Sequence, residues 1–348
     1  MRRISRITVA GAATASLALA LSACGSTSTS GSSDSKGNKG LAIAYDVGGK
    51  GDQSFNDAAY AGLEQAQKEF GYETADVEPT EGETDADKEQ RLASLAKQGY
   101  NPVIGVGYAY AAAVKGAAEK FPKTTFGIVD DATINSKNVA DLVFSEEQAS
   151  YLAGVAAAKS TKSNVVGFVG GVDIPLIHKF QAGFAQGVKD TNPKVKVLSQ
   201  YLTQTAEEGG FSSPDKGKTA AEGQIEKKAD VVYAAAGLSG QGVIEAAAAK
   251  KVWAIGVDSD QYKQAALAKY KDFILTSAMK DVAKAVYNLA KSVEDGKPET
   301  GIVRGDLKTG EVSLSDSNPK FADDAELQEA IKTAKEKIIS GEIKVKSS

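Results

Sequence analysis

The sequence predicts an α/β protein made of two similar domains, each a doubly wound parallel sheet, joined by a hinge. Three observations predict this class. Short apolar runs of strand length alternate with stretches whose apolar residues recur at helical spacing. This alternation begins near residue 41 and restarts with a similar layout near residue 145. A chain of 348 residues, 42% hydrophobic and 25% charged, has room for two domains of ordinary soluble composition.

The predicted first domain covers residues 41–144, and about 278–310 return to it. Its strands are expected at 41–45, 72–77, 102–106, 125–129 and 139–144. Its helices are expected through Ala59, Leu63, Ala66 and Phe70, and then at 85–98, 109–120 and 281–293. Right-handed crossovers between such units build a parallel sheet with helices on both faces.

The predicted second domain covers residues 145–277 and about 311–348. Its strands are expected at 165–169, 195–201, 231–235, 252–257 and 273–277, with a short one at 312–314. Its helices are expected at 145–159, through Phe180, Phe184 and Val188, and at 215–227, 243–250 and 325–339. The pattern itself leaves open which domain the C-terminal tail joins.

The N-terminus has the features of an export signal, predicted over residues 1–23. Three arginines precede an apolar segment that is too short to span a membrane. The Arg2-Arg3 pair leaves a twin-arginine signal as an alternative. Small residues before Cys24 resemble a bacterial lipobox, which implies cleavage before Cys24 and lipid on its thiol. Residues 24–40, rich in Ser and Gly, are expected to form a flexible tether.

Charge and rare residues narrow the function classes. Without the three signal arginines, 38 basic residues stand against 45 acidic ones, a net charge of −7. That balance argues against nucleic acid and leaves the acyl chains as the membrane contact. With one cysteine and one histidine we expect no disulfide, no metal site and no cofactor. His178 is interpreted as structural or exposed.

The loop after the first strand suits a neutral polar ligand. Gly48, Gly49 and Gly51 lie between Asp46 and Asp52. A glycine-rich loop before a helix commonly binds phosphate, but two carboxylates would repel it. The loop therefore favours hydroxyl or N–H donors. Ser54, three residues before Asp57, is predicted to start a capping box.

Polar residues and glycines recur where the predicted strands end. They are Asp46, Tyr108, Asp130, Asp173, Gly237 and Asp258. Two facing α/β domains would gather such loops in one cleft, and hinge closure on a ligand is usual for that layout.

Several of these residues also have an ordinary structural interpretation. Phe55 shares the helical register of Ala59 and Leu63, so periodicity alone places it in the core. Asp258 suits a helix cap, and Tyr233 lies inside an apolar strand. Asp130 and Asp131 are adjacent and therefore favour a turn over a catalytic pair.

Eight short motifs occur in a fixed order over about residues 41–290. They are DQSFN at 52–56, GVGY at 105–108, FGIVD at 126–130, YLAG at 151–154, GGVDIP at 170–175, AGLSGQG at 236–242, IGVDSDQ at 255–261 and TSAMK at 276–280. Together they resemble the basic membrane protein family, purine-nucleoside-binding lipoproteins that serve ABC importers. That family has the type I periplasmic-binding-protein fold.

The resemblance implies a role for individual residues. Asp46 and Asp52 would hydrogen-bond the ligand, and Phe55 would stack on its base. Asp258 would accept hydrogen bonds from the ribose hydroxyls, and Lys280 would bind the sugar at its 5′ side.

A second aromatic residue should cover the other face of the base. By motif position Tyr233 is the first choice and Phe211 the second. The remaining expected ligand-binding residues are Ser54, Asn56, Tyr108 and Gly237. One departure concerns Ala112, which stands in Ala111-Ala112-Ala113 where the family often has an acidic residue for the base. It leaves the base preference open.

The resulting prediction is a monomeric, non-enzymatic solute-binding protein on the extracytoplasmic face of the cell membrane, anchored at Cys24. It would deliver a nucleoside to an ABC permease and its ATPase. The alternatives are a sugar or furanone ligand in the same fold, a surface sensor, and a secreted hydrolase with paired carboxylates. The hydrolase is disfavoured because no catalytic constellation stands out.

Overall fold

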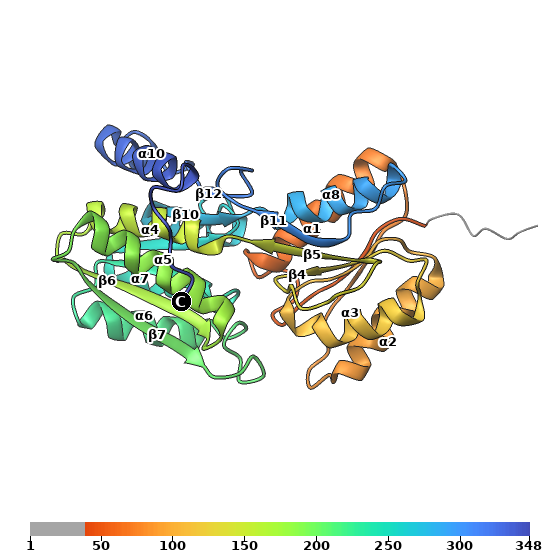
Figure 1. Cartoon of the computed structure of the whole chain (residues 1–348). Helices are drawn as coiled ribbons and strands as arrows, with labels where there is room; N and C mark the ends of the chain where they lie inside the picture. Colours follow the sequence, from red (N-terminus) through yellow and green to blue (C-terminus); the bar gives the residue numbers. More distant parts are fainter. Residues whose placement is uncertain (1–38) are drawn as a thin grey trace, which may run out of the picture. The chain divides into compact units, whose positions relative to one another are not determined.

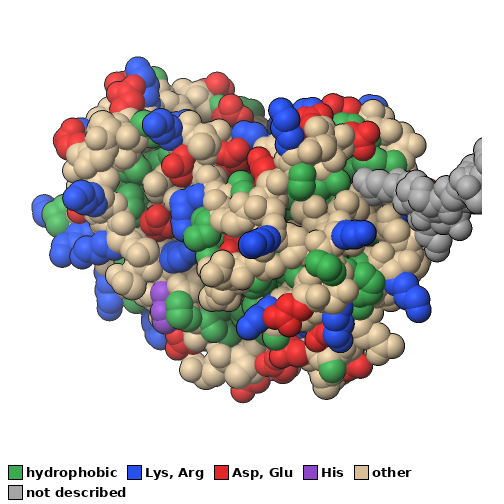
Figure 2. Space-filling view, turned by 45° about the vertical axis from the view of Figure 1, so that its right-hand side comes forward, with side chains coloured by type: hydrophobic (Ala, Val, Ile, Leu, Met, Phe, Trp, Pro, Cys, Tyr) green, Lys and Arg blue, Asp and Glu red, His purple; other side chains and the backbone are tan. Residues whose placement is uncertain are grey.

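The structure is a computed structural model that describes residues 39–348. The predicted signal, most of the tether and the lipidation residue Cys24 lie outside the described residues. Within the described range, no helix is both long and apolar enough to cross a membrane. The face in Figure 2 carries interspersed acidic and basic side chains, without one large basic patch.

Two six-stranded sheets organise the fold (Figure 1). The first has the order β11-β5-β4-β3-β1-β2. Its strands are Gly301–Gly305 (β11), Val139–Phe144 (β5), Phe126–Val129 (β4), Val103–Gly105 (β3), Ala42–Ala44 (β1) and Ala75–Val77 (β2). Its helices are α1 (Phe55–Phe70), α2 (Asp85–Gln98), the 3-10 turn η1 (Tyr108–Tyr110), α3 (Ala111–Lys120) and α8 (Val282–Glu294). We call this part the first lobe.

The second sheet has the order β12-β10-β9-β8-β6-β7. Its strands are Val312–Leu314 (β12), Ile274–Lys280 (β10), Trp253–Asp258 (β9), Val231–Ala235 (β8), Val165–Val172 (β6) and Lys196–Thr203 (β7). Its helices are α4 (Glu146–Ser160), α5 (Pro175–Thr191), α6 (Pro214–Glu226), α7 (Ser239–Lys250), η2 (Ala265–Phe273), α9 (Pro319–Ala322) and α10 (Ala325–Ile339). We call this part the second lobe. The paired strands are parallel except for β12, which is antiparallel to β10.

Strand β1 shows why an apolar run forms the centre of a sheet. Its alternating side chains enter different cores: Ile43 packs with Ala59 and Leu63 of α1, whereas Ala42 and Ala44 face α2 and α3. Because both faces are covered, the strand is apolar throughout. The predicted α/β class is therefore confirmed.

Four segments differ from the sequence prediction: η2 and α9 were not expected, nor was strand β11, and helix α7 starts early. Strand β11 was not predicted, because an edge strand with Ile302 61% exposed has no continuous apolar run. Helix α7 begins at Ser239, four residues before the expected start. The glycines there permit close helix packing: a Cβ on Gly242 would lie 1.8 Å from the Pro214 carbonyl oxygen. The sequence prediction treated residues 239–242 as loop because it did not take this helix packing into account.

Candidate functional site

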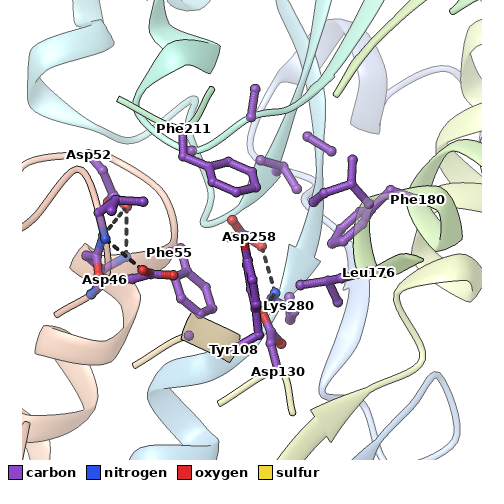
Figure 3. A pocket seen from close by; sticks show the side chains of 18 residues that line it. Asp46, Asp52, Phe55, Tyr108, Asp130, Leu176, Phe180, Phe211, Asp258 and Lys280 are labelled. Carbon is purple, nitrogen blue, oxygen red and sulfur yellow. Dashed lines mark hydrogen bonds and ion pairs between the residues drawn. The ribbon is translucent and has the colours of Figure 1, made fainter. Parts of the chain in front are cut away.

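The strand-end loops of both lobes line a cavity of about 530 Å³, counted with its opening to solvent (Figure 3). A concave site between two lobes, lined by strand-end loops, is the usual setting for a small-molecule ligand. The sequence-predicted residues that line it are Asp46, Asp52, Phe55, Asn56, Tyr108, Phe211, Gly237, Asp258 and Lys280. The other lining residues include Asp130, Leu176, Ile177 and Phe180.

Asp52 holds the first loop in place. Its Oδ1 accepts hydrogen bonds from the backbone N–H groups of Ser54 (2.9 Å) and Asp57 (3.2 Å). Its Oδ2 accepts from the backbone and side-chain amides of Asn56, at 2.8 and 3.1 Å. These bonds satisfy N–H groups at the start of α1, which lack partners inside the helix. The capping box predicted at Ser54 is wrong, since its side chain makes no cap hydrogen bond.

Asp46 follows β1 and lies against Gly107, the second glycine of the GVGY motif. A Cβ on Gly107 would fall 2.1 Å from the Asp46 Oδ2, so this close approach requires glycine. Burial raises the pKa of Asp46 to about 7, although the hydrogen bond donated by the Val47 N–H has the opposite effect and lowers this pKa. Asn56 Oδ1 accepts from the Asp46 backbone N–H at 3.0 Å. The carboxylate is therefore fixed at one end of the cavity and poised to titrate near neutrality.

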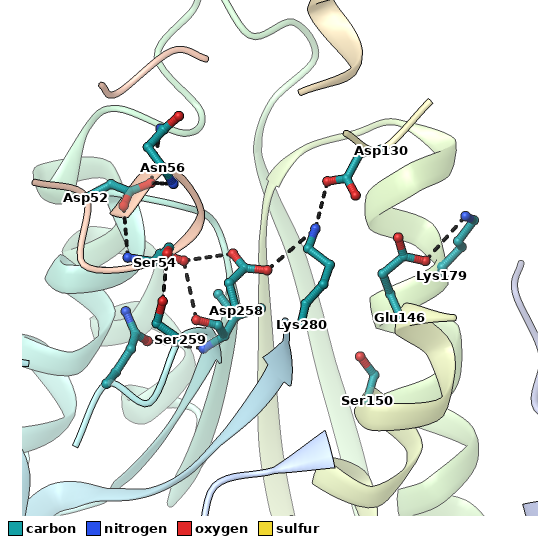
Figure 4. Close-up of polar contacts among 12 residues, drawn as sticks. Asp52, Ser54, Asn56, Asp130, Glu146, Ser150, Lys179, Asp258, Ser259 and Lys280 are labelled. Carbon is teal, nitrogen blue, oxygen red and sulfur yellow. Dashed lines mark hydrogen bonds and ion pairs between the residues drawn. The ribbon is translucent and has the colours of Figure 1, made fainter. Parts of the chain in front are cut away.

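Ser54 instead bonds across to the second lobe (Figure 4). Its hydroxyl donates to Asp258 Oδ2 at 2.8 Å, and its carbonyl oxygen accepts from the Ser259 hydroxyl at 2.7 Å. Gln261 Nε2 donates to the carbonyl oxygen of Gln53 at 3.0 Å. The DQSFN and IGVDSDQ motifs are thus hydrogen-bonded to each other, and Ser54 supports Asp258 without lining the cavity.

Lys280, at the end of β10, is the cation of the site. Its Nζ donates to Asp130 Oδ2 at 2.7 Å and lies 3.6 Å from Asp258 Oδ1, too far for a hydrogen bond. It is also 4.6 Å from the centre of the Phe55 ring. Burial alone would lower the pKa of Lys280, but Asp130, Asp258 and Glu146 raise it above its usual value. The lysine therefore stays charged.

Two of the acidic residues around Lys280 have a carboxylate oxygen that receives no hydrogen bond from the described residues. Asp130 and Asp258, both lining the cavity, each keep a buried Oδ1 with no hydrogen-bond partner among the described residues. Both residues have left-handed backbones, with φ of 67° and 62°. Backbone strain of this kind, here at two residues that both pair with Lys280, is typical of functional positions. Burial raises the pKa of Asp258, although Lys280 and the Ser54 hydroxyl oppose the rise.

Glu146, beside this group at the start of α4, pairs with Lys179 at 3.3 Å. Burial raises the pKa of Glu146 to about 7, with Asp130 adding to the rise. The acidic residues Asp46, Asp52, Asp130, Asp258 and Glu146 thus exceed the two lysines in this region. An additional anion such as phosphate is disfavoured, and neutral hydrogen-bond donors are favoured.

Two phenylalanine rings from different lobes enter the cavity (Figure 3): Phe55 from α1 and Phe211 from the loop before α6. A Cβ on Gly171 would lie 2.4 Å from the Phe211 ring, so the GGVDIP motif makes room for it.

Tyr233, the first choice for the second aromatic, does not reach the cavity. It is fully buried, its ring lies 5.2 Å from that of Phe184, and its hydroxyl pairs with the Ser150 hydroxyl at 3.1 Å. A central β8 strand packed on α4 and α5 directs this side chain into the core.

Asp130 was expected at the cleft as a strand-end residue but was assigned no ligand-binding role, and Phe180 was not predicted to lie there. For Asp130 the turn interpretation was preferred, although the residue follows a predicted strand as Asp46 and Asp258 do. Phe180 shares its helical stripe with core residue Phe184, so periodicity could not show that it borders the cavity. Among the described residues no cluster suited to a metal ion is found.

Two α/β lobes that enclose a cavity at the carboxyl ends of their strands define a class, the binding proteins that close around a small solute. Comparisons with known proteins identify the family within this class. A family model described as "ABC transporter substrate-binding protein PnrA-like" matches residues 40–348. This chain belongs to that family, Bmp, which confirms the resemblance found in the sequence.

Individual proteins similar to this chain are consistent with the family match. The ABC transporter nucleoside-binding protein BmpA of Lactococcus lactis is 37% identical over 323 residues, 88% of each chain. An uncharacterized lipoprotein of Pyrococcus abyssi is 34% identical over 294 residues, 79% of this chain and 69% of that one. The crystal structure of an Aeropyrum pernix ABC transporter solute-binding protein matches with a TM-score of 0.76 and 28% identity, covering 88% of this chain and 93% of the other. The family consists of solute-binding proteins, so the prediction of a non-enzyme is confirmed.

Proposed function

We propose that this substrate-binding protein captures a purine nucleoside between its lobes and delivers it to an ABC permease and its ATPase. The single observation that carries the ligand class is the pair of buried oxygens on Asp130 and Asp258, beside Lys280, that accept no hydrogen bond from the described residues. A buried acceptor without a donor is unfavourable by about 1–3 kcal/mol, and more when charged. Two neighbouring hydroxyls on a ribose would donate to both.

The rest of the cavity suits a flat base. Phe55 and Phe211 line the cavity from opposite lobes, and stacking on an aromatic side chain is worth about 1–3 kcal/mol per base in nucleic-acid complexes. Asp46 and Asn56 add polar atoms for the base edge. The acidic surroundings disfavour nucleotides, and the name of the Lactococcus relative supports a nucleoside.

A thermal-shift screen tests this assignment. Purine nucleosides should raise the melting temperature more than free bases, nucleotides or simple sugars, because only a ligand of the native state shifts it. Stabilisation by a sugar or furanone alone would contradict the proposal. Release of free base during incubation would indicate a hydrolase instead.

Asp258→Ala provides a second test. We expect loss of nucleoside binding by calorimetry with little change in fold, since the side chain lies at a strand end. Asp141→Ala is the matched control, because Asp141 is an equally buried carboxyl that does not line the cavity. Unchanged affinity in Asp258→Ala would remove this residue from the site.

We further propose that the protein is a monomer held on the extracytoplasmic face of the membrane by lipid on Cys24. The lipobox-like sequence and the lipoprotein name of the Pyrococcus relative support this. Cys24→Ala should release the protein into the soluble fraction of cells that otherwise retain it in the membrane fraction. Equal membrane retention of the variant would contradict the anchor.

A further inference from the structure

The wall of the ligand cavity is formed at one end by Tyr108. A second cavity of about 880 Å³, counted with its opening to solvent, lies beyond it, and Tyr108 is the residue that lines both. We call this second space the outer cavity. Asp46, in the ligand cavity, and Glu207, in the outer one, both act on the Tyr108 hydroxyl, whose pKa burial and these two acids raise to about 12. Tyr108 therefore stands between the two spaces.

The outer cavity has an apolar part in each lobe and a polar remainder. Ala109, Ala111 and Ala112 line it from the first lobe, and Val172 and Ile174 line it from the second. Ala112 leaves open the space where the resemblance predicts an acidic side chain for the base. Charged and polar side chains complete the lining, namely Asp85, Lys88, Gln204, Thr205 and Glu207. An uncharged group with an apolar face toward the alanines fits this surface.

The part of the ligand cavity around Lys280 offers no such continuation. Lys280 is 4% exposed and is held between Asp130 and Asp258, and Phe180 is also 4% exposed. Any group attached to the ligand at this end would have to displace a buried ion pair. A larger ligand would therefore extend past Tyr108.

We propose that the binding site continues past Tyr108 into the outer cavity, and that its ligands include purine nucleosides with an apolar substituent on the exocyclic amine. The inference rests on the proposed function, because it places the sugar at Lys280 and the base edge toward Asp46 and Tyr108. Rotation of one half-buried tyrosine side chain would join the two cavities.

Three ligands test the direction of this extension by calorimetry. Adenosine and N6-benzyladenosine should bind within about tenfold of each other, whereas 5′-O-benzyladenosine should bind more than about a hundredfold more weakly. The reverse order, or loss of binding with the N6 substituent alone, would overturn this inference and leave the proposed function intact. No binding of adenosine or any other nucleoside would overturn the proposed function itself.

A variant pair tests the location. Ala112 is an exposed residue in the first turn of α3, and of the two cavities it lines only the outer one. Ala112→Trp should therefore fill that space without disturbing the core. We expect it to weaken N6-benzyladenosine by about tenfold or more while adenosine stays within about twofold. Lys115→Trp, an exposed position on the same helix outside the lining, is the control. Equal effects of Ala112→Trp on both ligands, or no effect on either, would contradict the proposed path.

Discussion

Lys280 is the residue on which both the stability and the binding of this site depend. It neutralises Asp130 and Asp258 in a buried position, so Lys280→Met would leave their charges uncompensated. We expect the free energy of unfolding in urea to fall by about 3–5 kcal/mol, the usual effect of breaking a buried ion pair, and nucleoside binding to be lost. Lys284→Met is the control, because its pair with Glu311 is partly exposed and should contribute about 1 kcal/mol or less. Similar stability of the two variants would contradict this account.

Asp46 should make stability depend on pH. Its pKa in the native state is about 7, well above the usual value of about 4 for an aspartate, so the native state binds this proton more tightly than the unfolded state. The stabilisation is complete below about pH 4 and is lost as pH rises through 7. Asp46→Asn cannot ionise, and its stability relative to the wild type should rise by about 4 kcal/mol from pH 4 to 8, since a tenfold change in proton affinity is worth about 1.4 kcal/mol.

Chemical denaturation at several pH values measures this difference. The exposed Asp272→Asn serves as the control and should run parallel to the wild type. Parallel curves for Asp46→Asn and the wild type would show that Asp46 does not titrate as its burial predicts.

Single residues also show where sequence reasoning stops. Asp46, Asp258 and Lys280 were predicted as ligand-binding residues because each stands at the end of a strand-like run or in a family motif, and all three line the cavity. Tyr233 and Ser54 were misjudged because the sequence does not tell which side of a strand faces a ligand, or which of two neighbouring polar residues takes the cap. Those choices are made by packing with residues far away in the chain.

At the scale of elements, two loops from different lobes act as one unit. Ser54 holds the Asp258 carboxylate, and the neighbouring Gln53 carbonyl is held by Gln261. A Cβ on Gly256 would lie 2.3 Å from Gln261 Oε1, so the glycine of this motif admits the glutamine side chain. Sequence alone placed both loops at strand ends, but their mutual hydrogen bonds depend on how the lobes meet.

This pairing predicts a positioning role for Ser54. Ser54→Ala should weaken nucleoside binding by about tenfold or more, the value of a hydrogen bond to a charged group, and should reduce the preference for adenosine over its 2′-deoxy analogue. Ser54→Thr should restore both. Ser150→Ala, which removes another buried hydroxyl outside the cavity, is the control. Unaltered preference between the two ligands would show that Ser54 acts only in folding.

At the scale of the whole molecule, the chain passes between the sheets after β5, after β10 and between β11 and β12. The alternation of strands and helices predicted two sheets, and the family-like domain layout placed a crossing near residue 310, but β11 lacked the apolar run that would have shown the strand before it. The three connections are tied together: the Ser145 N–H donates to the Gly305 carbonyl at 2.9 Å, and the Asp281 N–H to that of Glu311 at 2.7 Å. Glu146 and Lys280 lie beside these connections, so the charged part of the site lies next to the segments that join the lobes.

The same connections predict that the lobes unfold together. One buried core contains residues of both sheets, including Ile43 of β1 and Phe168 of β6, so neither lobe can lose its packing without exposing apolar surface of the other. Calorimetry should therefore show a single transition. A nucleoside at a hundredfold excess over its Kd should add about 2.7 kcal/mol to the stability of the whole unit and move that transition upward without splitting it. Two transitions, of which the ligand shifts only one, would mean that the lobes are independent folding units and that the cavity draws its binding energy from one of them.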